Sequence, residues 1–347
     1  INLYTYLMMR FPNEKLNQVF LLWIVTLILL IILMIIVGGL TRLTDSGLSI
    51  TQWQLFSGIL PPLNQADWIY YFNLYKEIPE YKLQNFSMSM NDFKIIFWWE
   101  WAHRFLGRII GLAALLPLIY FSFKVEIKKL LDLYLVFLLI CFQGFMGWYM
   151  VSSGLVERVD VSHYRLSAHL LIAFIILSCL VWSFLNFKYN SNKNFFFNKT
   201  DTISIKILII LAFLQIVLGA FVSGLDAGKI YQTWPLMNNS FFPNDINFKD
   251  YKEFLDFEDR SVVQFIHRNV AYIIFFLIIY IGYFIRKTNK IYLYKAYFYL
   301  LAFIFLQIFL GVLALITDLN IIVASMHQIS SIILIILTIN FYYKSIN

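Results

Sequence analysis

The chain has 347 residues, of which 61% are hydrophobic and only 14% are charged. A water-soluble protein of this length needs a far more polar surface, so the composition indicates an integral membrane protein. The apolar residues form continuous runs, which predict helices and not a β-barrel. The net charge of +7 comes without a basic–aromatic array, so we expect no nucleic-acid partner.

Eight apolar runs are long enough to cross a membrane as helices. They lie near residues 18–40, 95–122, 130–151, 166–186, 203–225, 262–285, 294–316 and 321–342. The first run is too long for a cleavable signal peptide and is expected to be the first span. The sequence therefore predicts an all-α integral membrane protein with eight transmembrane helices.

Charges are distributed unevenly among the segments that connect these runs. If the N-terminus is cytoplasmic, the inner segments carry 14 Lys and Arg against 4 Asp and Glu, whereas the outer segments carry 10 against 15. A basic excess on the inner side is typical of membrane proteins. The pattern predicts that both termini lie on the cytoplasmic or matrix side.

The two halves of the chain repeat the same motifs. GGLTRLTDSGLSITQW at 38–53 aligns with GAFVSGLDAGKIYQTW at 219–234 at an offset of 181, and the His-Arg pair at 103–104 aligns with that at 267–268 at an offset of 164. Each half contains four predicted helices, so both halves enter the membrane from the same side. We predict two four-helix bundles related by a pseudo-twofold axis along the membrane normal.

Four of the five histidines obey this repeat. They lie on the second and fourth predicted helices of each half, near the outer end: His103, His169, His267 and His327. Two imidazoles that project from facing helices into a bundle are a standard way to hold a haem iron, whereas zinc needs four ligands close together. A packing role is the alternative, which repetition in type and depth disfavours. His163 has no counterpart and receives no functional assignment.

Arginines accompany these histidines. Arg104 and Arg268 directly follow a histidine, Arg108 lies one turn deeper, and Arg165 lies one turn before His169. Arginine pairs with carboxylates in a bidentate manner, so these four residues are candidates for contacts with haem propionates. The alternative, which suits Arg165 well, is contact with lipid headgroups.

Glu100 distinguishes the two halves. It precedes His103 by three residues and shares its helix face, whereas Gln264 occupies the aligned position in the second half. The first half therefore has an acid or base beside its haem ligand, and the second half can only hold a cofactor. The alternative interpretation of Glu100 is a carboxylate paired with Arg104 or Arg108.

These motifs together resemble the haem A synthase family. The resemblance rests on GGLTRLTDSGLSITQW, EWAHRFLGR, FIHRNVAY and MHQIS, and most specifically on GLDAGKIYQTWPLM at 224–237. Some bacterial members carry cysteine pairs in outer loops. Cys141 and Cys179 both fall in predicted helices here, so the chain resembles the branch that proteobacteria and mitochondria share.

The resemblance implies oxidation of the C8 methyl of haem O to a formyl group through a hydroxymethyl intermediate, which supplies haem A for cytochrome c oxidase. His103 and His169 would hold the substrate haem in a unit at 1–186, with Glu100 as the catalytic carboxylate. His267 and His327 would hold a haem b cofactor in a unit at 206–347, and 187–205 would be a cytoplasmic-side linker.

The resemblance also implies partners and a location. The expected partners are membrane lipid, haem O, a haem O synthase (protohaem farnesyltransferase) and an electron acceptor, with a homo-oligomer left open. The expected location is a bacterial inner membrane or the mitochondrial inner membrane. Two other classes share some of these features, namely a diheme b-type electron-transfer cytochrome and a transporter. The Glu100/Gln264 difference disfavours the first, and the parallel repeat disfavours the second.

Overall fold

The computed structural model describes residues 10–53, 57–157, 159–196, 202–246 and 255–346. Eight long helices dominate this part of the chain: α1 (Glu14–Leu43), α4 (Met90–Ser122), α5 (Leu131–Glu157), α6 (His163–Lys188), α7 (Ile203–Gly224), α9 (Arg260–Lys287), α10 (Tyr294–Ile316) and α11 (Ile321–Ser345). All eight helices are long and apolar enough to cross a membrane, and they lie where the apolar runs predicted them. The prediction of an all-α membrane protein with eight spans is confirmed.

Capping residues extend several helices beyond their apolar runs. Helix α4 begins at Met90, five residues before the predicted run, because Ser89 and Asp92 form a capping box. The Ser89 Oγ accepts the Asp92 backbone N–H at 3.3 Å, and an Asp92 carboxylate oxygen accepts the Ser89 N–H at 3.2 Å. Helix α9 begins at Arg260, two residues before the predicted run, because the Asp259 side chain accepts the backbone N–H groups of Ser261 and Val262.

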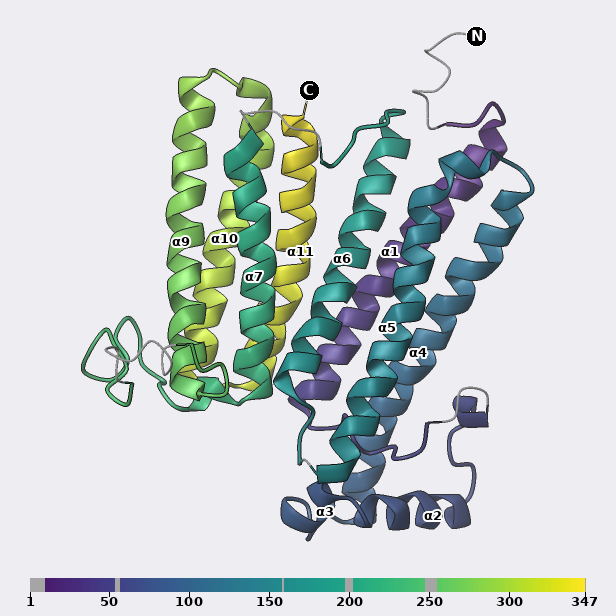
Figure 1. The fold of residues 1–347 in the computed structure, drawn as a ribbon, viewed down its shortest axis with the longest axis vertical. Helices are drawn as coiled ribbons and strands as arrows, with labels where there is room; N and C mark the ends of the chain where they lie inside the picture. The colour runs from purple at the N-terminus through teal and green to yellow at the C-terminus, as the bar shows by residue number, and fades with distance from the viewer. Residues whose placement is uncertain (1–9, 54–56, 158, 197–201, 247–254, 347) are drawn as a thin grey trace.

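The helices pack as two groups of four (Figure 1). In the first unit, α1 contacts α4 and α6, and α5 contacts α4 and α6; in the second unit, α7 contacts α9 and α11, and α10 contacts α9 and α11. The units meet where α6 packs on α7 and α11, and where α1 packs on α11. The pseudo-twofold axis and the domain limits stay predictions.

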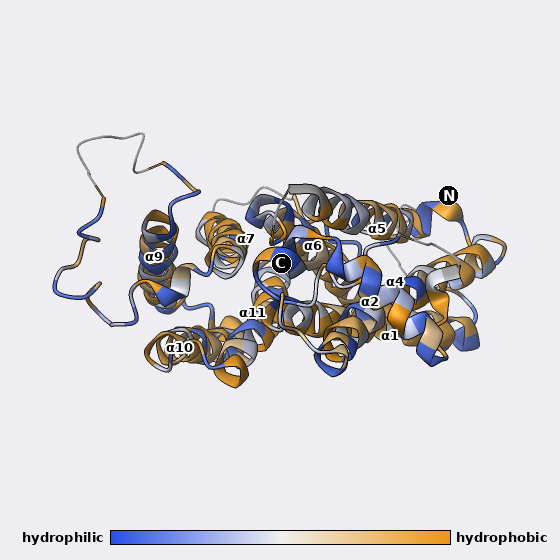
Figure 2. Cartoon of the chain, turned by 90° about the horizontal axis from the view of Figure 1, so that it is seen from below, coloured by the Kyte–Doolittle hydropathy of each residue, from blue (hydrophilic) through white to orange (hydrophobic). Residues whose placement is uncertain are grey.

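Polarity is concentrated at the ends of the bundle. Viewed along the helices, the spans are mainly hydrophobic, whereas the connection between α7 and α9 is largely hydrophilic (Figure 2). Helix α1 begins and α11 ends at the same end (Figure 1). The opposite end, called the loop end below, carries the long connections after α1 and after α7. The assignment of the termini to the cytoplasmic or matrix side stays a prediction.

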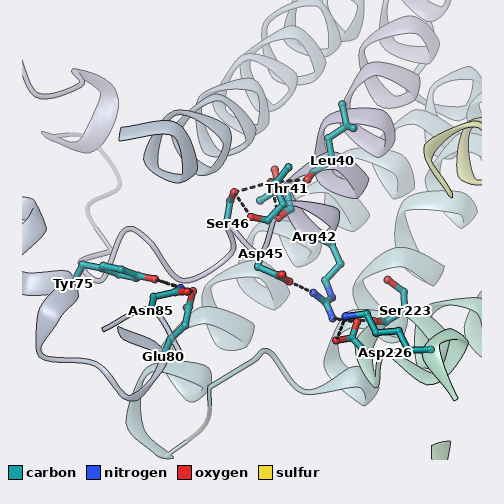
Figure 3. A network of polar contacts seen from close by, with 12 residues as sticks. Leu40, Thr41, Arg42, Asp45, Ser46, Tyr75, Glu80, Asn85, Ser223 and Asp226 are labelled. Atoms are coloured by element: carbon teal, nitrogen blue, oxygen red, sulfur yellow. Dashed lines mark hydrogen bonds and ion pairs between the residues drawn. The ribbon is translucent and has the colours of Figure 1, made fainter. Parts of the chain in front are cut away.

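The connection after α1 contains two short helices that sequence analysis did not predict, α2 (Gln65–Lys76) and α3 (Pro79–Leu83). Their apolar side chains pack with α4 in a second hydrophobic cluster. Glu80 is buried here, with 4% of its surface exposed. It accepts hydrogen bonds from the Tyr75 hydroxyl at 2.9 Å and the Asn85 side-chain amide at 3.3 Å (Figure 3). Burial raises the pKa of Glu80 from its ordinary 4.5 to about 8.

We expect the stability of this connection to fall as pH rises. Between pH 4.5 and 8 the unfolded chain releases the Glu80 proton while the folded chain retains it, so the free energy of unfolding decreases across this window. Melting temperatures in detergent between pH 5 and 9 measure the effect. Glu80→Gln should flatten the profile, and Glu77→Gln, at an exposed carboxyl nearby, should leave it unchanged. A profile that keeps its slope in Glu80→Gln would contradict the assignment.

Arg42, near the end of α1, joins the two units at the loop end (Figure 3). Its guanidinium pairs with Asp45 and donates to the Ser223 carbonyl of α7 at 2.8 Å. The Asp226 carboxylate lies 3.6 Å from the same guanidinium. At the repeat offset of 181, Ser223 is the counterpart of Arg42 and Asp226 is the counterpart of Asp45. Equivalent residues of the two units therefore meet at this contact.

Removal of the Arg42 charge should weaken the contact between the two units and lower the stability of the protein. A hydrogen bond from a charged donor contributes about 2 kcal/mol, and the Arg42 side chain is only 17% exposed. We therefore expect Arg42→Gln to lower the melting temperature clearly more than Arg260→Gln, at an exposed arginine that starts α9. Equal melting temperatures for the two variants would show that the contact does not hold the units together.

Candidate haem-binding site

Each of the four repeated histidines packs against a glycine on the preceding long helix. A Cβ atom at Gly38 on α1 would lie 2.8 Å from Cε1 of His103 on α4, and one at Gly147 on α5 would lie 3.4 Å from Cε1 of His169 on α6. In the second unit the corresponding distances are 3.3 Å for Gly219 and His267, and 3.0 Å for Gly311 and His327. The glycines therefore make room for the imidazole rings.

The two histidines of the first unit face each other. The ring centroids of His103 and His169 are 6.5 Å apart, and the ring planes are tilted by 54°. Metal–imidazole bonds are about 2 Å long, so a metal atom between two such rings would separate their centroids by about 6 Å. The spacing of this pair therefore fits a single bridging metal atom.

The bonding capacity of these rings is only partly used. The Nδ1 atoms of His103, His169 and His267 are buried and accept or donate no hydrogen bond to the described residues. Each of the four side chains nevertheless retains some accessible surface. In the described part of the chain, no cluster of three or more His, Cys, Asp or Glu side chains could hold a metal ion. Pairs of histidines suit haem, whose macrocycle supplies the remaining iron ligands, and do not suit zinc.

Three of the four histidines are also held by a glutamine. The side-chain amides of Gln143, Gln215 and Gln307 donate to the backbone carbonyls of His169, His267 and His327 at 2.9, 3.0 and 3.0 Å, respectively. Each glutamine lies four residues before the glycine that packs on the same histidine. No role was predicted for these glutamines from the sequence. The recurring Gln-x-x-x-Gly spacing was the available signal.

Glu100 is buried, with 3% of its surface exposed, and three donors surround it. It accepts the Ser49 hydroxyl at 2.7 Å, the Ile50 backbone N–H at 2.6 Å and an Arg104 N–H at 2.5 Å. The pairing with Arg104 that sequence analysis kept as an alternative is therefore present. This pairing fixes the carboxylate one helical turn from His103.

The second unit repeats this geometry with an amide in place of the carboxylate. Gln264 is also 3% exposed, and its side-chain nitrogen donates to the Tyr231 carbonyl at 2.9 Å. At the 181 offset, Tyr231 is the counterpart of Ile50. Glu100 and Gln264 therefore fix the same loop position to the same helix position, and only one of them carries an ionisable group.

Arg104 and Arg268 anchor the connections at the loop end. Arg104 donates to the carbonyls of Ile50 at 2.7 Å and Gln52 at 3.1 Å. Arg268 donates to their repeat counterparts, the carbonyls of Tyr231 at 2.8 Å and Thr233 at 3.0 Å. Both arginines were predicted as partners of haem propionates. Their bonds to these carbonyls were not predicted, because the sequence does not reveal how a loop folds back on a helix.

The remaining candidates lie apart from one another. Arg108 lines a narrow pocket at the loop end together with Arg104 and Trp101. Arg165 donates to the Ser153 hydroxyl and stacks over Tyr149, so it joins α6 to α5. His163 is 3% exposed and packs closely against Gly224 of the second unit. A structural role at the contact between the units therefore suits His163.

The amino-acid sequence is similar to those of known proteins. Residues 21–339 match a family model described as cytochrome oxidase assembly protein. The chain is 48% identical over 328 residues to a protein named heme A synthase from Pelagibacter ubique, with 94% of this chain and 96% of the relative covered. It is 43% identical to one of that name from Rickettsia bellii, with 90% and 94% covered. The match spans nearly the whole chain, and the chain therefore belongs to the haem A synthase family.

Proposed function

We propose that the chain oxidises the C8 methyl group of haem O to a formyl group through a hydroxymethyl intermediate, and thereby makes haem A for cytochrome c oxidase. The observation that carries this proposal is the pair of similar histidine sites, of which only the first has a carboxylate one turn away. A methyl group and one water become a formyl group with release of four protons and four electrons. The electrons must pass to an acceptor, and the protons need a base.

The first unit is assigned to the substrate and the second to a cofactor. His103 and His169 would ligate the iron of haem O, because they face each other and lie beside Glu100. His267 and His327 would ligate a haem b, because Gln264 gives that site no ionisable partner. When bound, haem supplies the redox chemistry, whereas the protein supplies ligation, orientation and proton handling.

Glu100 is assigned as the proton acceptor of the first unit. Its carboxylate cannot rotate freely, because Ser49, Ile50 and Arg104 all donate to it. A fixed carboxylate next to the substrate can take a proton from the methyl group or from a water that attacks the oxidised carbon. Arg104 keeps the site close to neutral overall when the carboxylate is ionised.

Arg108 is assigned to the anionic end of the substrate. It lines the narrow pocket at the loop end, where Trp101 forms an apolar wall. Haem carries two propionates, which guanidinium groups bind in a bidentate manner. Arg104, Arg165 and Arg268 are weaker candidates, because the described contacts engage Arg165 with Ser153, and Arg104 and Arg268 with equivalent loop carbonyls.

Extraction of haem from cells tests this function. The chain is expressed with a haem O synthase in a host that makes no haem A, and the extracted haems are separated by chromatography and mass. Wild type should yield haem A or its hydroxymethyl precursor. Glu100→Gln should fold, since Gln264 shows that an amide fits this position, and should accumulate haem O. We expect at least a hundred-fold loss of product, because general-base groups contribute about that much or more.

Glu80→Gln is the matched control, because it changes a buried carboxyl in the same half and should leave the products unchanged. A wild type that binds haem b and returns only unmodified haem O would instead favour an electron-transfer cytochrome. Product formation by Glu100→Gln at the wild-type level would remove Glu100 from the chemistry while leaving the synthase assignment intact.

Single histidine variants test which unit holds which haem. His267→Ala and His327→Ala should lose most of the bound haem b and its low-spin absorbance, because bis-histidine ligation is broken. His103→Ala and His169→Ala should retain haem b in the second unit. His163→Gln is the control and should keep the wild-type spectrum, since His163 packs at the contact between units. Loss of haem b from the first-unit variants alone would reverse the assignment.

A further inference from the structure

The four histidine sites differ in one contact that the proposed function does not use. Glutamines hold His169, His267 and His327 through their backbone carbonyls. Two of these amides also lie close to the imidazole itself, with Gln215 Nε2 at 3.3 Å from His267 Nε2 and Gln307 Nε2 at 3.2 Å from His327 Nδ1. A glutamine on the neighbouring helix therefore bonds to the backbone of each of these three histidines. For His267 and His327 the same glutamine also contacts the imidazole ring.

His103 lacks this tie. The position four residues before Gly38 on α1 is Met34, which is the repeat counterpart of Gln215 at the offset of 181. Among the described residues, no side chain donates a hydrogen bond to the His103 carbonyl or to its Nδ1. The Met34 methyl group instead lies at Gly107, where a Cβ atom would be 3.4 Å away. An apolar contact therefore replaces a polar one at this site.

The helix that carries His103 is also less constrained than its counterpart. Gly107 follows His103 by one turn, and the aligned residue in α9 is Ala271. Glycine in a helix interior increases the conformational freedom of the backbone. A methionine side chain is flexible and adapts to changes in its surroundings without loss of a hydrogen bond. Small movements of the His103 segment of α4 therefore break no hydrogen bond to His103 itself, whereas equivalent movements at the other three sites would break the bond from a glutamine to the histidine carbonyl. The hydrogen bonds that join α1 to the α4 backbone lie at least one turn away, from Thr41 to the Trp99 carbonyl at 3.4 Å and from Trp23 to the Ala113 carbonyl at 2.8 Å.

We propose that Met34 makes His103 the exchangeable axial ligand, and this inference rests on the proposed function. The bond between His103 and the substrate iron breaks and re-forms without a change in oxidation state, while His169 stays bound. The substrate haem can thus enter the first unit and leave it as product. A haem held by His267 and His327 would stay in place, because glutamines hold both histidines. Met34 is a positioning residue that acts through His103.

Carbon monoxide binding measures this exchange directly. The gas binds ferrous haem only after one axial histidine has left the iron, so its binding rate reports ligand release independently of product formation. In wild type we expect a fast phase from the first-unit haem and a slow phase from the second. Met34→Gln, which copies the second unit, should slow the fast phase about five-fold, the factor that corresponds to one typical hydrogen bond.

Two further variants separate a positioning role from simple packing. Met34→Leu keeps an apolar side chain and should retain the fast phase at the wild-type rate. Gln215→Met, the reciprocal change, should speed carbon monoxide binding to the second-unit haem. Equal slowing by Met34→Gln and Met34→Leu, or no slowing by Met34→Gln, would overturn the inference.

Haem content per chain is measured before the kinetics. A purified chain that binds two haems and shows none of the expected rate changes would overturn the Met34 inference alone. A well-folded chain that binds no haem would overturn the proposed function, and the inference would fall with it. The two failures are therefore distinguishable in one preparation.

Discussion

The close contact between each imidazole and a glycine is the constraint on which the rest of the structure depends. A histidine in an apolar bundle must lie where two helices meet, because polar rings that face lipid are unfavourable. A side chain larger than hydrogen at Gly38 or Gly311 would occupy the space of the ring. The same requirement acts in both units, and it sets the helix separation there. The four rings are consequently in position in the protein fold itself.

The contrast between the units arises from few changes on a common framework. Arg104 and Arg268 bind equivalent loop carbonyls, and Glu100 and Gln264 face equivalent loop residues. An acid in place of an amide adds a group that exchanges protons without a change in the shape of the site. The chain is a membrane oxidoreductase in which only the first half has an ionisable side chain at this position.

Much of this architecture could be predicted from the sequence, because membrane helices leave a strong local signal. Long apolar runs located all eight spans, and the internal repeat identified four of the five histidines as a set. The contacts across the bundle could not be predicted in the same way. The bond between Gln328 and the Ile35 carbonyl, at 2.8 Å, joins α11 to α1 across nearly the whole chain. Helices α2 and α3 were missed because their residues are of mixed polarity and show no long apolar run.

The contact at Arg42 has a consequence for the way the protein is made. Asp45 is synthesised three residues after Arg42, but the Ser223 carbonyl is added 181 residues after it. During translation the guanidinium is therefore incompletely bonded until α7 has been inserted beside α1 and α6. N-terminal units generally fold first as the chain emerges. The first unit is therefore made before the Ser223 carbonyl is available to Arg42. A chain truncated before α7 would leave the Arg42 guanidinium without the Ser223 carbonyl. Incomplete and complete chains therefore differ in a feature that membrane quality control can recognise.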